Sequence, residues 1–221
     1  MSRILCIETS THSCSVAIGE DNAIIDSRII TGESYLHAEK LHPLLSQLTS
    51  LSSEKPGAIA VSMGPGSYTG LRIGVAAAKG LCLAWNIPLI SIDTLQLIAI
   101  RAEQMLPGMD LYIPMIDARR MEVYMRVFDK NSGGVSPVEA RIVDHHFFEL
   151  FGSASMAIAG DGAAKFVDFL LPGQHFIPGV IPLAEVMFPL ALEKFALGET
   201  EDLASFEPYY LKDFIPGPAK T

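Results

Sequence analysis

Residues 58–70 read AIAVSMGPGSYTG and join an apolar run to a glycine-rich loop. The run Ala58–Met63 contains a single polar side chain, which is typical of a strand buried on both faces of a sheet. From about Thr69 to Trp85, apolar residues then recur at helical spacing. A buried strand, a tight loop and a helix therefore follow one another, and this order predicts an α/β fold.

Three short apolar runs precede this unit, at Ile4–Ile7, Cys14–Ile18 and Ala23–Ile30. Short polar turns separate them, so we expect three strands in an antiparallel meander. A helix should follow over about residues 34–51, because leucines recur there at helical spacing. Pro43 lies within this helix and removes one backbone donor, so a kink or a restart is expected there.

Downstream of the quoted stretch, residues 88–92 indicate another strand. Asp93 is placed to cap a third helix that runs to about residue 103. The predicted order is therefore βββαβαβα. This is the order of a ribonuclease-H-like lobe.

Pro107-Gly108 is the best boundary signal in the chain. The strand pattern begins again beyond it, with strands predicted at 111–116, 121–128, 135–143, 156–159 and 175–177 and helices at 147–151, 162–170 and 183–197. We expect two ribonuclease-H-like lobes, one at residues 1–106 and a smaller, trimmed copy at 107–214, followed by a mobile tail at 215–221.

The composition excludes several classes of protein. Apolar residues make up 49% of the 221 residues and charged residues 19%, so the chain can bury a core and is not disordered. The net charge of −9 has the wrong sign for a surface that must neutralise phosphates by itself, so a role with nucleic acid needs a basic partner or a local basic patch. No apolar run reaches the roughly 18 residues of a membrane span, and no signal peptide precedes the first strand, so a cytoplasmic protein is expected.

No sequence motif indicates a cofactor or a metal ion. The loop at residues 64–70 is not followed by the Lys-Ser/Thr pair of a P-loop, and its glycine spacing is one residue longer than that of a dinucleotide-binding loop. His37 and His42 are five residues apart, whereas a helical metal-binding pair is spaced i, i+4. The three cysteines suit neither a disulfide framework nor a zinc site.

The helix predicted at residues 69–85 contains unusually many small residues. Gly74 and Gly80 lie in its interior, where glycine costs about 1 kcal/mol relative to alanine, so each needs a reason. The usual reason is the close approach of another backbone. Two alternatives stay open: the helix packs against its own lobe, or it forms a surface for another chain together with the helix that contains Pro43.

Glu8 and Asp117 end the first strands of the two predicted lobes. A two-lobed phosphotransferase of this architecture would hold Mg²⁺ and phosphates at these positions, with the hydroxyls of residues 9–11 nearby. An ATPase or phosphotransferase acting on its own is therefore the alternative function, although this turn lacks glycine. Arg119 and Arg120 form either a salt-bridged turn or a basic handle for a partner or a phosphate.

Several motifs together resemble the bacterial TsaB family, also called YeaZ. They are ILCIETS at residues 4–10, HAEKL at 37–41, SMGPGSYTGLRIG at 62–74, IDARRMEVY at 116–124 and EPYYLK at 207–212. The glycine-rich motif is highly specific. The resemblance covers nearly the whole chain, most strongly up to residue 125 and only loosely over residues 140–200.

The resemblance implies the actin/Hsp70/sugar-kinase-like (ASKHA) fold with two ribonuclease-H-like lobes. It also implies a non-catalytic partner of TsaD, the subunit that carries the metal-binding histidines, in the placing of threonylcarbamoyl on N6 of adenosine 37 of tRNA. The resemblance further implies that a TsaE-like ATPase joins the pair and that tRNA is bound only through the complex. A homodimer is expected to form through the same surface when the partner is absent.

The sites expected on this basis contain no catalytic residue, no metal ligand and no cofactor. The expected partner interface consists of Leu41, Leu44, Leu45, Leu48, Gly70, Arg72, Gly74, Ala77 and Leu81. The candidate contacts to a phosphate or a partner are Glu8, Thr9, Ser10, Asp117, Arg119 and Arg120.

Overall fold

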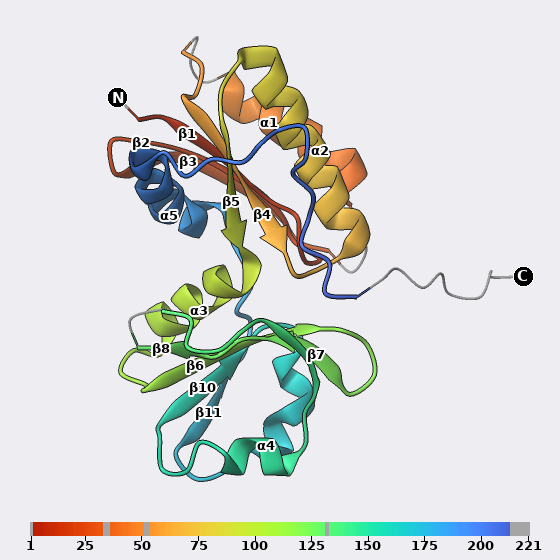
Figure 1. Cartoon of the computed structure of the whole chain (residues 1–221), viewed down its shortest axis with the longest axis vertical. Helices are drawn as coiled ribbons and strands as arrows, with labels where there is room; N and C mark the ends of the chain where they lie inside the picture. Colours follow the sequence, from red (N-terminus) through yellow and green to blue (C-terminus); the bar gives the residue numbers. More distant parts are fainter. Residues whose placement is uncertain (1, 33–35, 51–53, 131–132, 213–221) are drawn as a thin grey trace, which may run out of the picture.

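The structure is a computed structural model that describes residues 2–32, 36–50, 54–130 and 133–212. Its strands form a five-stranded and a six-stranded sheet, and helix α3 (Thr94–Met105) lies between them (Figure 1). No helix in these residues combines the length and the apolar composition that crossing a membrane requires.

The first sheet has the strand order β3-β2-β1-β4-β5. β1, β2 and β3 form the predicted antiparallel meander, and β4 and β5 extend the sheet in parallel beside β1. The bounds are β1 (Ile4–Glu8), β2 (Cys14–Glu20), β3 (Ala23–Ile30), β4 (Ala58–Gly64) and β5 (Leu89–Asp93).

Helices cover both faces of the first sheet, because alternate side chains of its central strands enter two different cores. In β1, Leu5 and Ile7 pack on the side of α1 and α2, whereas Ile4 and Cys6 pack on the side of α5. The bounds of these helices are α1 (His37–Thr49), α2 (Tyr68–Trp85) and α5 (Ala184–Leu197). The sequence-based expectation of a strand buried on both faces is therefore confirmed for β4, where Ala58–Val61 are fully buried.

Local signals fix the ends of the helices. Asp93 caps α3 as predicted, since its side chain accepts a hydrogen bond from the Leu95 amide (2.8 Å). Ser67 caps α2 through the Gly70 amide (3.2 Å). Pro43 lies inside α1, which continues to Thr49. The predicted ends of that helix at residues 34 and 51, and the predicted tail at 215–221, lie outside the described residues.

The second sheet has the strand order β11-β10-β6-β7-β9, and β8 also pairs with β6. Its strands are β6 (Leu111–Asp117), β7 (Glu122–Met125), β8 (Phe128–Asp129), β9 (Glu139–Ile142), β10 (Met156–Ala159) and β11 (Gln174–Ile177). Two short helical segments accompany them, α4 (His145–Glu149) and the 3₁₀ helix η1 (Ala163–Phe169).

The prediction of one strand over residues 121–128 is wrong, because the ladder to β6 is interrupted between β7 and β8. The register places Pro114 of β6 opposite Arg126, and proline has no N–H to donate. The Val127 amide instead donates to the Ser136 hydroxyl (2.9 Å). The same contact shortens the next predicted strand, since Ser136 and Pro137 lie outside β9.

The chain returns to the first sheet at its C-terminal end. The predicted boundary at Pro107 lies between the strands of the first sheet and those of the second. The division of the chain into two lobes at this point stays a prediction. α5, predicted within the second lobe, packs against β1, β2 and β5. The Phe188 ring lies where a side chain on Gly19 would stand, and the Ala184 amide donates to the Ser15 hydroxyl (2.9 Å).

Residues 199–212, here called the C-terminal strap, then cross β5 and α2 (Figure 1). The Glu201 amide donates to the Leu89 carbonyl (2.8 Å) and the Tyr209 amide to the Met63 carbonyl (2.7 Å). The strap ends at an ion pair between Lys212 and Glu122 of β7. It therefore connects the first sheet to the second.

The turn after β1 explains two of the small residues of α2. Thr9 is fully buried, and its hydroxyl donates to the Gly70 carbonyl (2.9 Å). A Cβ atom on Gly70 would overlap the Thr9 carbonyl, and one on Gly74 would overlap the Thr9 hydroxyl. The first of the two alternatives, packing of the helix against its own lobe, therefore accounts for both glycines.

Gly74 and Gly80 provide a matched pair for testing this packing. We expect Gly74→Ala to lower the free energy of unfolding by about 1–3 kcal/mol, because the new methyl group displaces Thr9. Gly80→Ala should raise it by up to about 1 kcal/mol, because within the described ranges no atom lies within 4 Å of a Cβ there and alanine favours the helix. Urea unfolding of the two variants measures both effects, and equal effects would contradict the assignment.

Candidate functional site

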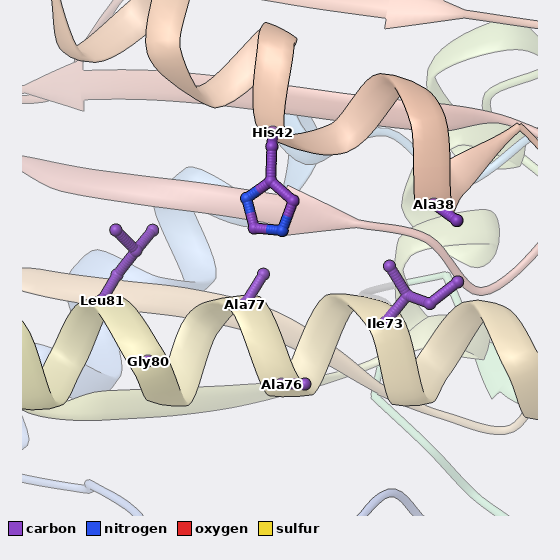
Figure 2. A pocket seen from close by; sticks show the side chains of 7 residues that line it. All are labelled: Ala38, His42, Ile73, Ala76, Ala77, Gly80 and Leu81. Carbon is purple, nitrogen blue, oxygen red and sulfur yellow. The ribbon is translucent and has the colours of Figure 1, made fainter.

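An open groove of about 490 Å³ runs between α1 and α2. The side chain of His42 points across it toward Ala77, and between Ile73 and Leu81 the glycine and alanines of α2 leave little side chain (Figure 2). The backbone of α2 is therefore open to close approach from outside. The groove is lined by Ala38, His42, Ile73, Ala76, Ala77, Gly80 and Leu81.

Only two of the predicted interface residues, Ala77 and Leu81, line this groove. Gly70 and Gly74 face the turn after β1, and Arg72 is exposed outside the groove lining. The four predicted leucines are at most 5% exposed and belong to the core under α1, where they hold the helix from within: Leu41, Leu44, Leu45 and Leu48.

The other groove residues were missed, because Ala38 and His42 are not among the leucines of α1 and the rest lie on the outer side of α2. The one feature of the sequence that could have indicated this groove was Gly80, a glycine in the interior of a helix. No atom of the described residues lies within 4 Å of a Cβ built on it, so the packing of these residues does not require glycine there. Leu83, three residues further along the same side of α2, is 70% exposed and extends this apolar surface.

The predicted phosphate contacts at the turn after β1 are buried. Glu8, Thr9 and Ser10 are at most 1% exposed. The Ser10 amide (2.6 Å) and hydroxyl (2.5 Å) both donate to Glu8 Oε1, so these groups already bond one another. The structure thus places the three residues together, but inside the protein.

Burial raises the pKa of the Glu8 carboxyl, and hydrogen bonds from Ser10 oppose this rise. Glu8 Oε2 and the buried Ser62 hydroxyl are neighbours, and in the described part of the chain neither has another hydrogen-bond partner. A proton on Oε2 would satisfy this site, whereas a charge there would be desolvated. Burial therefore disfavours the charged form of this carboxyl.

His37 joins the start of α1 to the same turn. Its Nε2 lies 2.8 Å from the Thr11 carbonyl, which can only accept, so Nε2 carries the proton. Burial lowers the pKa of this histidine. The two helices that border the groove are thus both fixed to residues 9–11.

A smaller cavity of about 130 Å³ lies between the two halves and is lined by residues that include Thr11, His12, Ser13 and Asp161. Sites for small molecules typically occupy about 300–1,000 Å³. Neither Glu8 nor Asp117 lines it, so the structure does not bring the two candidate carboxylates into one pocket. In the described part of the chain, His, Cys, Asp and Glu side chains form no group of three or more that could hold a metal ion.

Asp117, Arg119 and Arg120 lie at the exposed turn between β6 and β7. Asp117 forms an ion pair with Lys165 of η1 and accepts a hydrogen bond from the Arg119 amide (2.6 Å). The sequence left open a salt-bridged turn or a basic handle. The ion pair occupies the aspartate and leaves both guanidinium groups in solvent.

The state of Glu8 can be tested through the pH dependence of stability. A carboxyl with a raised pKa in the folded state stabilises the fold most below its ordinary pKa of 4.5, and this contribution is lost as the pH rises through the folded pKa. We therefore expect Glu8→Gln to gain stability relative to the wild type as the pH increases above 4.5. Urea unfolding between pH 4.5 and 8, with Glu207→Gln as an exposed control, measures the difference, and a constant difference would contradict it.

Comparison with known proteins identifies the family. Residues 32–150 match the family model described as TsaD: tRNA N6-adenosine threonylcarbamoyltransferase. The tRNA threonylcarbamoyladenosine biosynthesis protein TsaB of Haemophilus influenzae is 32% identical, with 96% of this chain and 94% of that protein covered. TsaB of Escherichia coli is 29% identical, with 96% of each chain covered.

Solved structures agree with these relatives. YeaZ from Pseudomonas aeruginosa is 27% identical and superposes with a TM-score of 0.79, covering 96% of this chain and all of that one. The ethanolamine utilization protein EutJ from Carboxydothermus hydrogenoformans, at 10% identity and a TM-score of 0.52, shares the fold. The two mixed sheets thus form an actin-like (ASKHA) fold, and the chain belongs to the TsaB family.

Proposed function

We propose that this chain is the non-catalytic partner of a TsaD-type subunit in the formation of N6-threonylcarbamoyladenosine at position 37 of tRNA. The names of its relatives assign those proteins to tRNA threonylcarbamoyladenosine biosynthesis. In such a complex this chain supplies a docking surface, and the TsaD-type subunit carries out the transfer.

Gly80 is the observation that carries this proposal. Glycine inside a helix costs about 1 kcal/mol relative to alanine, and at this position no packing contact in the part of the chain that the structure describes requires it. A glycine at this position would be useful in the groove between α1 and α2, because a helix of another chain can reach the backbone of α2 at Ala76 and Gly80. The second alternative, a surface for another chain, thus fits the outer side of α2.

The resemblance between the proposed partners supports a TsaD-type occupant. The TsaD family model matches residues 32–150 of this chain, a stretch that includes α1 and α2. A TsaD-type subunit is therefore expected to have a related pair of helices, and two related pairs can pack face to face around a pseudo-twofold axis. The same reasoning allows a second copy of this chain to occupy the groove when the partner is absent.

Burial of the turn after β1 supports a non-catalytic role. A phosphotransferase would need Glu8 to be ionised and open to a metal ion, but this carboxyl is buried, and burial raises its pKa. The hydroxyls of Thr9 and Ser10 are likewise engaged with Gly70 and Glu8. Binding of a TsaE-like ATPase and of tRNA is assigned to the assembled complex.

Ala76→Arg tests the groove directly. The arginine side chain fills the space that a partner helix would enter, so we expect affinity for the TsaD-type subunit of the same organism to fall at least about 30-fold, the equivalent of about 2 kcal/mol. Calorimetric titration measures the affinity. Threonylcarbamoyladenosine in tRNA from the reconstituted reaction should fall with it.

Ala196→Arg is the matched control, because Ala196 is exposed on α5, which covers the opposite face of the same sheet. This variant should bind the partner and support modification as the wild type does. The proposal fails if Ala76→Arg binds with unchanged affinity, or if the isolated wild-type chain modifies tRNA unaided.

A further inference from the structure

The turn between β6 and β7 presents two arginines in an unfavourable backbone conformation. Arg119 has a φ of 73° and Arg120 a φ of 52°, and both are exposed. Two consecutive positive φ values in a hairpin turn favour Asn-Gly, whereas bulky side chains are disfavoured there. The chain therefore retains a costly turn that has two guanidinium groups at its tip.

Internal contacts hold this arginine tip in place through its backbone. The Arg119 amide donates to Asp117 Oδ1 (2.6 Å), the Glu122 amide to the Arg119 carbonyl (3.2 Å), and Lys165 Nζ to the Arg120 carbonyl (2.7 Å). Among the residues the structure describes, neither guanidinium group has an ion pair or a hydrogen bond. The tip is therefore fixed while its donors remain available.

The carboxylates around the arginine tip are already occupied. Asp117 is paired with Lys165, and Glu122 is paired with Lys212 of the C-terminal strap. Asp161, the third carboxylate here, accepts the Asp117 amide (2.9 Å). Among the described residues named here, four cations thus meet three carboxylates, an excess of positive charge in a chain whose net charge is −9.

Aromatic side chains continue this surface along the C-terminal strap. Tyr210, two residues before Lys212, lies with its ring 4.9 Å from that of Tyr68. The Arg72 guanidinium lies 4.1 Å over the Tyr68 ring, and its Nε donates to the Tyr210 hydroxyl (3.1 Å). Flat aromatic and guanidinium surfaces beside free cations are the side chains that stack on bases and contact phosphates.

We propose that the arginine tip, together with the Tyr68–Arg72–Tyr210 stack, contacts the phosphodiester backbone of the tRNA held by the complex. This inference rests on the proposed function, because that function brings a tRNA to this chain. Guanidinium groups bind phosphate oxygens in bidentate fashion, and the excess negative charge elsewhere explains why the chain needs a partner to hold the RNA.

The variant Arg119→Asn/Arg120→Gly removes both positive charges and is expected to keep the turn folded. It installs the residues that this turn favours, so the midpoint of thermal unfolding should equal or exceed that of the wild type. In complex with the TsaD-type subunit, binding of an in vitro transcribed tRNA should weaken about 10- to 60-fold at 0.1 M salt. The slope of log affinity against log salt concentration should decrease in magnitude by about 2.

Lys55→Ala/Lys130→Ala is the control, because it removes the same charge from two exposed positions outside this surface. It should leave both the affinity and the salt slope close to those of the wild type. Arg119→Gln/Arg120→Gln replaces the first variant if the Asn-Gly turn does not fold.

Affinity for the TsaD-type subunit is measured first for every variant, so that a failure of docking is distinguished from a failure of RNA binding. Normal docking with reduced tRNA binding supports the inference. Unchanged tRNA binding, an equal loss in the lysine control, or a loss confined to binding of a TsaE-like ATPase overturns it.

Discussion

The close packing of Thr9 against α2 is the constraint on which the first half of the molecule depends. Glycine at positions 70 and 74 lets the turn after β1 reach the helix, and the Thr9 hydroxyl then satisfies the Gly70 carbonyl. His37 attaches the start of α1 to the same turn through Thr11. One buried turn therefore sets the separation of two helices, and the groove between them is a consequence of that separation.

α2 uses small residues for two different purposes on two sides. Gly70 and Gly74 face inward and admit a turn of the same chain, whereas Ala76 and Gly80 face outward and leave the backbone accessible. The inward pair serves stability, and in our proposal the outward pair serves association. In our proposal the chain thus keeps the ASKHA fold and uses it as a docking surface for a related subunit, while the Glu8 carboxyl stays buried.

Local patterns were sufficient to predict the first sheet and the cap of α3, because alternation, turns and caps involve neighbouring residues. The break between β7 and β8 was not predictable in this way, since it depends on Pro114 in the strand alongside. The candidate site could not be predicted in full for the same reason, because it depends on residues that are far apart in the sequence. Gly74 and Gly80 look alike in sequence, and only the position of Thr9, 65 residues from Gly74, shows which one faces inward.

The C-terminal strap has a mechanical consequence. It is anchored to Met63 at the end of β4, runs beside Arg72 on α2, and reaches Glu122 on the second sheet. A movement that separates the two sheets would therefore break at least one of these contacts. A molecule that contacts α2 beside Arg72 would therefore also meet the C-terminal strap, and through it would influence the position of the hairpin between β6 and β7.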